Sequence, residues 1–111
     1  VLALHFAVNA QQIMVYLAGD STMAEKKADK RPETGWGEKL QQFFDEKKVK
    51  IENHAQNGRS TKSFINEGRW QKIIDALKKG DYVFIQFGHN DEKLDKPEVG
   101  AAANGEYRNN L

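Results

Sequence analysis

Residues 15–22 constrain the fold of this chain more than any other stretch. The run Val15-Tyr16-Leu17-Ala18 is apolar or small on both faces, which is typical of a central parallel strand. Gly19 then allows a sharp turn, which places Ser21 just past the carboxyl end of the strand. Open α/β sheets form their ligand crevices at that edge, so Ser21 is a candidate nucleophile. The alternative is that Asp20 or Ser21 only caps the following turn.

Composition narrows the possible functions. The chain has 111 residues, enough for one small domain with its own core, and its net charge of +1 predicts neither a nucleic-acid partner nor an anionic membrane surface. No apolar run is long enough to span a bilayer. Cysteine is absent, which excludes disulfides, thiolate chemistry and cysteine-based zinc sites.

The first ten residues differ in character from the rest. Residues 1–10 are apolar except for His5 and Asn9, and Val8-Asn9-Ala10 has small residues where a signal peptidase cleaves. We interpret residues 1–10 as the remnant of a signal peptide, which predicts a secreted or periplasmic protein. An extra buried strand or an arbitrary start is the alternative.

Periodicity predicts alternating strands and helices. Strands are expected over residues 13–18, 49–54 and 82–87, and the nearly continuous apolar run of the third predicts that it is central. Apolar spacings of three and four residues predict helices over 36–44 and 68–79. This order favours parallel strands joined by right-handed helical crossovers.

Parallel strands bring their carboxyl ends to one edge, where three polar clusters should meet. These clusters are Gly19-Asp20-Ser21, Asn57-Gly58-Arg59 and Gly88-His89-Asn90-Asp91. Residues 92–111 lack strong periodicity, although a helix could begin within 106–111. Three strands are few for an open parallel sheet, so residues 11–111 are expected to be the N-terminal part of one truncated domain.

The clusters supply the groups that acyl transfer needs. A serine hydroxyl becomes nucleophilic when a base takes its proton. The negative oxygen that then develops needs hydrogen-bond donors aimed at it. The N–H of Ser21, the N–H of Gly58 and the side-chain amide of Asn90 can form such an oxyanion hole.

This combination resembles the SGNH (GDSL-like) hydrolases, and within them the rhamnogalacturonan acetylesterase group. The matching stretches are Gly19-Asp20-Ser21-Thr22, Gly35-Trp36-Gly37, Asn57-Gly58-Arg59-Ser60 with Ser63-Phe64, and Gly88-His89-Asn90-Asp91, with Glu67-Gly68-Arg69-Trp70 and Gly80-Asp81-Tyr82-Val83 as fitting spacers. Three ordered blocks are far more specific than one triplet. The resemblance covers residues 13–91 and implies a three-layer α/β/α, flavodoxin-like fold with a parallel sheet, of which only the first three strands are present.

The resemblance also implies a function. Ser21 would attack an acetyl ester on a plant cell-wall polysaccharide such as rhamnogalacturonan, and Ser21, Gly58 and Asn90 would hold the oxyanion. The intermediate would be an acetyl-serine, and neither a metal nor an organic cofactor is used. The family's Asp-x-x-His block, which supplies the base, does not occur in this chain. We therefore expect the fragment alone to be inactive.

Other polar residues allow alternatives. His5 lies in the predicted leader, and His54 is expected to be a packed or capping side chain. His89 either lines the site or stabilises the local structure. We reject the hypothesis that His89 is the base and Asp91 its orienting carboxylate, because residues so close in sequence rarely orient each other as a catalytic triad requires. Arg59 either contacts an acidic sugar or holds the turn after the second strand.

The remaining candidates have structural interpretations. Trp36 and Trp70 lie at helical core spacing and are expected in the core. The lysines of residues 26–30 are expected to be solvated, and Tyr107 is expected to have a surface or packing role.

Two other functions remain open. One is a lipid or thioester hydrolase of the same superfamily, although the polar strand-end loops favour a sugar. The other is a non-catalytic flavodoxin-like binding module, which would hold a phosphate on a loop after the first strand. The sequence does not indicate an oligomeric state.

Overall fold

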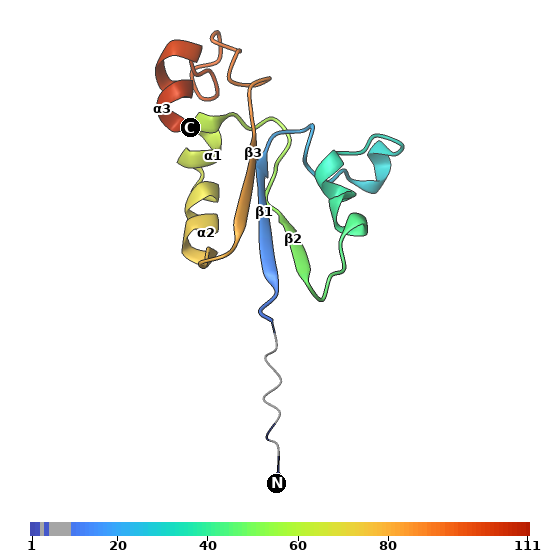
Figure 1. Cartoon of the computed structure of the whole chain (residues 1–111). Coiled ribbons are helices and arrows are strands. Elements are labelled where there is room, and N and C mark those ends of the chain that lie inside the picture. The colour runs from blue at the N-terminus through green and yellow to red at the C-terminus, as the bar shows by residue number, and fades with distance from the viewer. Residues whose placement is uncertain (3, 5–9) are drawn as a thin grey trace.

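A parallel sheet of three strands organises the chain in the computed structural model, which describes residues 1–2, 4 and 10–111 (Figure 1). The strands are β1 (Ile13–Gly19), β2 (Val49–Asn53) and β3 (Tyr82–Gln86), in the order β2-β1-β3. Both pairs are parallel, with Ile13 opposite Val49 and Val15 opposite Tyr82. The carboxyl ends of all three strands therefore lie at one edge, as predicted.

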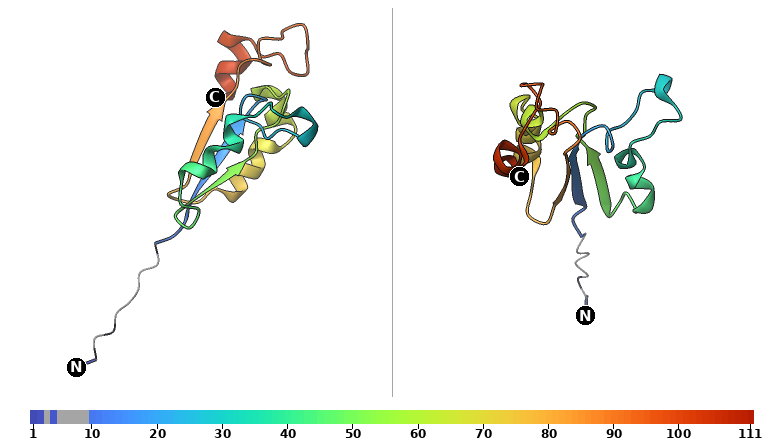
Figure 2. Two further views of the ribbon diagram at one scale, coloured as in Figure 1. Left: turned by 90° about the vertical axis from the view of Figure 1, so that its right-hand side faces the viewer. Right: turned by 90° about the horizontal axis from the view of Figure 1, so that it is seen from above.

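In the described residues, short helices and turns connect the strands or follow β3. Three are α-helices: α1 (Thr61–Asn66), α2 (Arg69–Ala76) and α3 (Arg108–Asn110). The others are the 3₁₀ turns η1 (Ala28–Lys30), η2 (Trp36–Glu38) and η3 (Leu40–Phe43), and the π-type turn η4 (Ala103–Tyr107). Figure 2 shows α1 and α2 together on one side of the sheet, and η3 packs on the other through Leu40. The α/β architecture with a parallel sheet is confirmed.

Strand β1 separates two apolar clusters. Tyr16 and Ala18 face α1 and α2, where they pack with Phe64 and Ile73. Val15, Leu17 and Met23 form the second cluster on the opposite face, with Leu40 and Ile51 against them. Leu17 and Ala18 have no exposed surface, so the strand is buried on both faces, as its unbroken apolar run requires.

The helix predicted over residues 36–44 is wrong, because the segment forms η2 and η3 instead. Gly37 donates its N–H to the Met23 carbonyl (3.1 Å), and a Cβ at Gly37 would lie 2.6 Å from that oxygen. The Gln41 side chain bonds the Val49 carbonyl and the Ile51 N–H at the free edge of β2 (3.0 and 2.8 Å). These tertiary contacts override the helical period.

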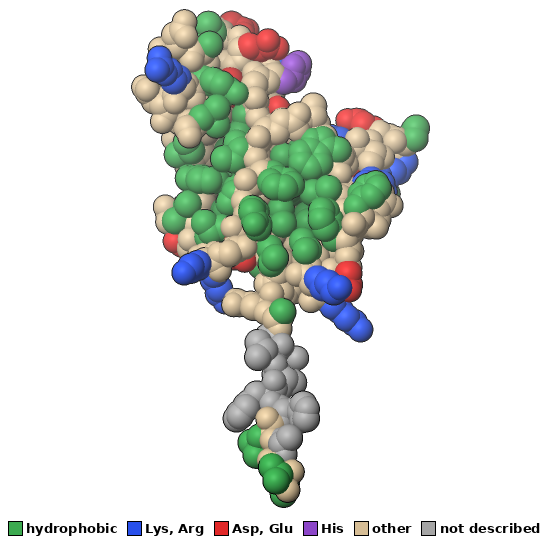
Figure 3. Space-filling model, in the orientation of Figure 1, with side chains coloured by type: hydrophobic (Ala, Val, Ile, Leu, Met, Phe, Trp, Pro, Cys, Tyr) green, Lys and Arg blue, Asp and Glu red, His purple; other side chains and the backbone are tan. Residues whose placement is uncertain are grey.

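In the sheet formed by the described residues β1 lies between β2 and β3, so β3 is at one edge. That the third strand is central in the complete domain stays a prediction. An apolar run predicts burial but does not say which strands are its neighbours. Hydrophobic side chains gather over the sheet in Figure 3. Several aromatic side chains keep more than a third of their surface exposed: Trp36, Phe43, Phe44, Tyr82 and Phe84. Trp36 is thus not in the core.

The remaining elements differ from the predictions in detail. Residues 68–79 contain α2, which begins at Arg69 and ends at Ala76, and the separate helix α1 was not predicted. Ser60 caps α1: its hydroxyl accepts the Ser63 N–H (3.1 Å), and the Ser63 hydroxyl accepts the Ser60 N–H (2.9 Å). A helix does begin within residues 106–111, as α3.

The predicted leader, residues 1–10, falls mostly on residues 3 and 5–9, which lie outside the described part of the chain and include His5. No helix in the described ranges is long and apolar enough to cross a membrane.

Neighbouring isoleucines of α2 allow a test of the fold. Ile73→Ala is expected to lower the free energy of unfolding of the complete protein by about 2–5 kcal/mol, because a buried side chain leaves a cavity when truncated. Ile73 is fully buried, whereas Ile74 is 43% exposed, so Ile74→Ala is the matched control, with an expected loss below about 1 kcal/mol. Urea unfolding followed by circular dichroism measures both. Equal losses would contradict this placement of α2.

Candidate active site

The turn after β1 contains Asp20 and Ser21, for which the sequence predicts either a capping role or, for Ser21, a nucleophile. The buried Asp20 carboxylate accepts hydrogen bonds from the Thr22 N–H and the Thr22 hydroxyl (both 2.9 Å). The Asp20 carbonyl accepts the N–H groups of Met23 and Ala24. Asp20 is therefore the capping residue. Within the described residues no hydrogen bond holds the half-buried Ser21 hydroxyl.

The turn that follows β2 carries Gly58. Its φ of +76° lies in the left-handed region, which glycine adopts without strain. Gly58 is exposed, and its N–H meets no acceptor among the described residues. An N–H that is already free can bind an oxyanion with no internal hydrogen bond to break first.

Arg59 holds this turn in place, which is one of its two predicted roles. Its Nε donates to both carboxylate oxygens of Glu67 (3.1 Å each), and Nη1 donates to the Asn57 carbonyl (2.9 Å). Hydrogen bonds first from Arg69 and then from Arg59 lower the pKa of the Glu67 carboxyl below its usual value. Glu67 therefore remains an anion that can keep Arg59 in position.

Asn90 joins the loop after β3 to the turn after β2. Its side chain is buried, with Nδ2 donating to the Arg59 carbonyl (2.9 Å) and Oδ1 accepting from Lys93 (2.7 Å). A carboxamide has two N–H groups, so one remains for another acceptor. The structure thus places Asn90 beside the Gly58–Arg59 turn.

Asp91 and His89 have separate partners. The buried Asp91 accepts the Thr61 N–H and hydroxyl at Oδ1 (2.9 and 2.5 Å), which ties the β3 loop to the start of α1. His89 is largely exposed and lies 3.4 Å from Glu92. Because His89 pairs with Glu92 and Asp91 pairs with Thr61, the two do not form a base and its orienting carboxylate.

The lysines of residues 26–30 are not all solvated, because Lys26 is 5% exposed. Its Nζ contacts the Ser21 carbonyl, the Asn57 side-chain oxygen (2.9 Å) and Glu33 (3.5 Å). Sequence analysis missed this residue because nothing in the charge pattern distinguishes it from its neighbours. With Asn90, it links all three strand-end turns.

The other candidate residues have packing roles. His54 stacks at a tilt against Tyr16, with ring centroids 5.9 Å apart, and pairs with Glu52 (2.7 Å), as predicted for a packed side chain. The Tyr107 hydroxyl donates to the Phe87 carbonyl (3.1 Å). Trp70 packs half-buried against the α1–α2 cluster, as predicted.

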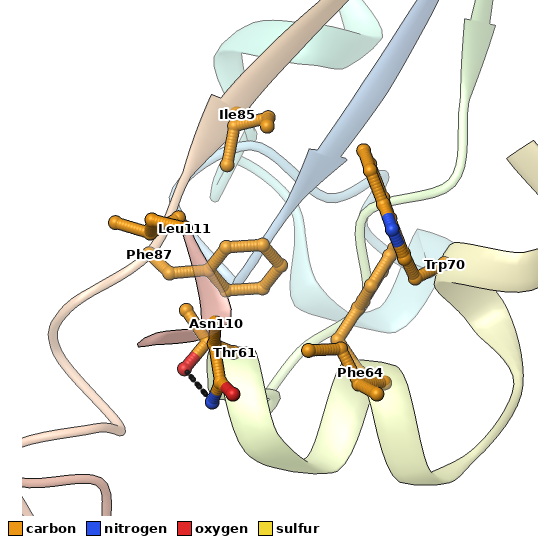
Figure 4. Close-up of a pocket in the computed structure, with 8 residues that line it drawn as sticks. Thr61, Phe64, Trp70, Ile85, Phe87, Asn110 and Leu111 are labelled. Atoms are coloured by element: carbon orange, nitrogen blue, oxygen red, sulfur yellow. Dashed lines mark hydrogen bonds between the residues drawn. The ribbon is translucent and has the colours of Figure 1, made fainter. Parts of the chain in front are cut away.

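An apolar pocket lies between α1, α2, β3 and the chain end at Asn110 and Leu111 (Figure 4). Phe64, Trp70 and Phe87 point into it, and Asn110 bonds Thr61 at its edge (3.0 Å). The rings of Phe64 and Phe87 meet edge-on, with centroids 5.1 Å apart. None of the predicted site residues lines this pocket, and three of its lining residues are exposed: Ile65, Ile85 and Leu111. In the described part of the chain no acidic or histidine cluster is arranged to hold a metal ion.

Comparison with known proteins identifies the family. The model of the GDSL-like lipase/acylhydrolase family matches residues 15–105. The chain belongs to this family. The match includes β1 from Val15 onward, all of β2 and β3, and every predicted site residue, so the turns after the three strands are parts of a GDSL-type hydrolase domain.

Among curated relatives of this GDSL-family chain are rhamnogalacturonan acetylesterases. The Bacillus subtilis protein RhgT is 49% identical over 73% of this chain and 34% of its own length. The Emericella nidulans enzyme is 49% identical over 69% of the chain and 28% of its own length. The chain therefore spans about a third of the length of these curated relatives.

A solved structure matches the fold. The crystal structure of the Bacillus subtilis protein YxiM superimposes with a TM-score of 0.70, at 29% identity over 77% of this chain and 24% of that one. The three-stranded parallel sheet is thus the arrangement found in a related protein.

Glu38 anchors the backbone beside the site and allows a pH test. The Lys26 N–H, with Arg31 and Lys39, stabilises its carboxylate and lowers the pKa of Glu38 from 4.5 to about 2. A carboxyl whose pKa is lower in the folded state stabilises the fold above pH 4.5 and loses this contribution as the pH falls toward 2. Glu38→Gln is therefore expected to lower the melting temperature most above pH 4.5.

Melting temperatures of the complete protein measured across this pH range check the prediction, with the exposed Glu25→Gln as the control. The difference between wild type and Glu38→Gln should shrink on acidification. A constant difference would show that the charge of Glu38 is not what stabilises the fold.

Proposed function

We propose that this chain is the nucleophile-bearing part of a serine acetylesterase that removes acetyl groups from a rhamnogalacturonan or pectin-type polysaccharide. The proposal depends mainly on one observation about the turn after β1. Asp20 caps this turn, which leaves the Ser21 hydroxyl free at the carboxyl end of the strand. The two relatives named rhamnogalacturonan acetylesterase support the substrate class.

The surface beside the proposed oxyanion donors supports a sugar substrate. A hollow next to Gly58 is lined mainly by polar side chains: Arg59, Ser63, Asn66, Glu67 and Glu98, with Val99. Carbohydrates present hydroxyl groups that such side chains can bond, whereas an acyl chain would need an apolar wall. These polar side chains support a sugar as the group that lies beside Gly58.

In the proposed first step the Ser21 Oγ attacks the acetyl carbonyl carbon and its proton passes to a base. The carbonyl oxygen becomes an oxyanion, which accepts hydrogen bonds from the N–H groups of Ser21 and Gly58 and from the Asn90 side chain. Collapse of this intermediate breaks the bond to the sugar oxygen, and that oxygen takes the proton from the base. The products are a free sugar hydroxyl and an acetyl-serine.

In the second step water attacks the acetyl-serine with help from the same base, which releases acetate and restores Ser21. The proposed base is the His of an Asp-x-x-His motif. That motif does not occur in these 111 residues, so the proposal places it in a part of the complete protein beyond them. All of these steps are proton transfers and acyl transfers, and they call for no metal and no organic cofactor.

The residues before Gln11 support a proposal on location. We propose that the protein is exported, to the periplasm or the medium, by cleavage after the Val8-Asn9-Ala10 sequence. Polysaccharides are too large to enter cells intact, so an esterase that acts on them is expected outside the cytoplasm.

Ser21→Ala tests the nucleophile in the complete protein. Acetate release is expected to fall at least about 10⁴-fold, because a missing nucleophile leaves only binding and the oxyanion donors. Lys27→Ala, which changes an exposed side chain of the same loop, is the control and should retain activity within a few-fold. Release of acetate from acetylated rhamnogalacturonan measures both. Full activity in Ser21→Ala would refute the proposal.

The isolated 111-residue chain tests the origin of the base. Its turnover of p-nitrophenyl acetate is expected to be negligible beside that of the complete protein, because its 111 residues contain no Asp-x-x-His motif to supply the proposed base. Circular dichroism on the same sample checks that the chain is folded. Comparable turnover by the folded chain would show that the base lies within residues 1–111.

A further inference from the structure

Lys26 is a buried cation that the mechanism above leaves without a role. Its side chain is only 3% exposed. Burying an ammonium costs free energy unless each N–H finds an acceptor. Lys26 has three: the Ser21 carbonyl, the Asn57 Oδ1 (2.9 Å) and a Glu33 carboxylate oxygen (3.5 Å).

These acceptors lie on two different turns of the candidate active site. One is the carbonyl of Ser21, the proposed nucleophile, and Lys26 lies five residues further along the chain. Another is the side chain of Asn57, 31 residues away, which directly precedes Gly58. One ammonium group therefore holds together the turn that carries the nucleophile and the turn that carries a proposed oxyanion donor.

The backbone of Lys26 is fixed as well. Its N–H donates to Glu38 Oε2 (3.0 Å), and the other oxygen of Glu38 accepts from Arg31 (2.5 Å) and Lys39 (3.1 Å). The Glu38 side chain is itself only 8% exposed. Because Lys26 is held at both ends, it can transmit the position of one turn to the other.

The contact made by Nζ indicates how Lys26 acts. Nζ bonds the main-chain oxygen of Ser21, and none of its hydrogen bonds is to the Ser21 hydroxyl, so it is not placed as the base. We propose that Lys26 is a positioning residue, which keeps the Ser21 and Gly58 N–H groups at the spacing that one oxyanion requires. This proposal rests on the esterase function proposed above.

Two N–H groups stabilise the same oxyanion only when both lie about 3 Å from it. They come from turns that share no regular secondary structure. A displacement of about 1 Å at an active site costs roughly 10²-fold in rate. A bridge between the turns therefore affects the chemical step far more than it affects binding of a long polysaccharide.

Lys26→Met in the complete protein tests this role, because methionine keeps most of the chain length and removes the charge and the donors. We expect kcat on an acetyl ester to fall about 10- to 100-fold, with KM changed less than about 3-fold. Lys27→Met is the matched control: the exposed neighbouring lysine should give wild-type values. Rates are normalised to active sites titrated with a fluorophosphonate, so that unfolded enzyme does not count.

Asn57→Ala covers the case in which Lys26→Met does not fold. It removes only the acceptor on the exposed second turn and leaves Lys26 bonded to Ser21 and Glu33. We expect a smaller fall in kcat per titrated site, about 3- to 10-fold, again with little change in KM. A purely structural role would lower the melting temperature and the number of titrated sites, but not kcat per site.

Ser21→Ala, assayed alongside, separates failure of this inference from failure of the proposed function. Suppose that Ser21→Ala is inactive but Lys26→Met keeps the wild-type kcat per titrated site. The positioning role is then wrong and the esterase proposal stands. Where Lys26→Met does not fold, Asn57→Ala is judged in the same way. If Ser21→Ala retains full activity, both are wrong.

Discussion

Burial of β1 on both faces is the constraint on which the rest of this structure depends. The strand is hydrogen-bonded to β2 on one side and to β3 on the other, and each face packs against its own apolar cluster. No charged side chain lies in this strand, and the charged and polar residues begin where it ends. Since the neighbouring strands run parallel, their polar ends arrive at the same edge, and the candidate active site is a consequence of that topology.

The turns at this edge have little regular structure, and buried polar side chains hold them together. Lys26 joins the Ser21 and Asn57 turns, Asn90 joins the Arg59 carbonyl to the β3 loop, and Asp91 joins that loop to Thr61. Buried polar groups are costly without partners, so each link favours one arrangement of the turns. The N–H groups of Ser21 and Gly58 are left out of this network, as donors for a substrate must be.

The sequence predicted the strands well and the connections poorly. Unbroken apolar runs ended by Gly-Asp-Ser and Gly-His-Asn-Asp placed β1 and β3, because parallel strands are covered on both faces. The segment containing Trp36 has helical spacing but forms 3₁₀ turns, because Gly37 packs against the backbone at Met23. The order β2-β1-β3 was not predicted either, since an apolar run does not show which strands are its neighbours.

The sequence by itself determined the strands, the places where they stop and the three blocks that mark a GDSL-type hydrolase. It could do so because these features depend on neighbours in the chain. Only the tertiary structure decided that Asp20 caps the turn while Ser21 stays free, that Arg59 serves its own turn, and that Lys26 is buried. A buried lysine is stable only where acceptors surround its ammonium group. The acceptors of Lys26 come from separate segments, including Asn57, which lies 31 residues away, so the charge pattern around Lys26 does not predict its burial.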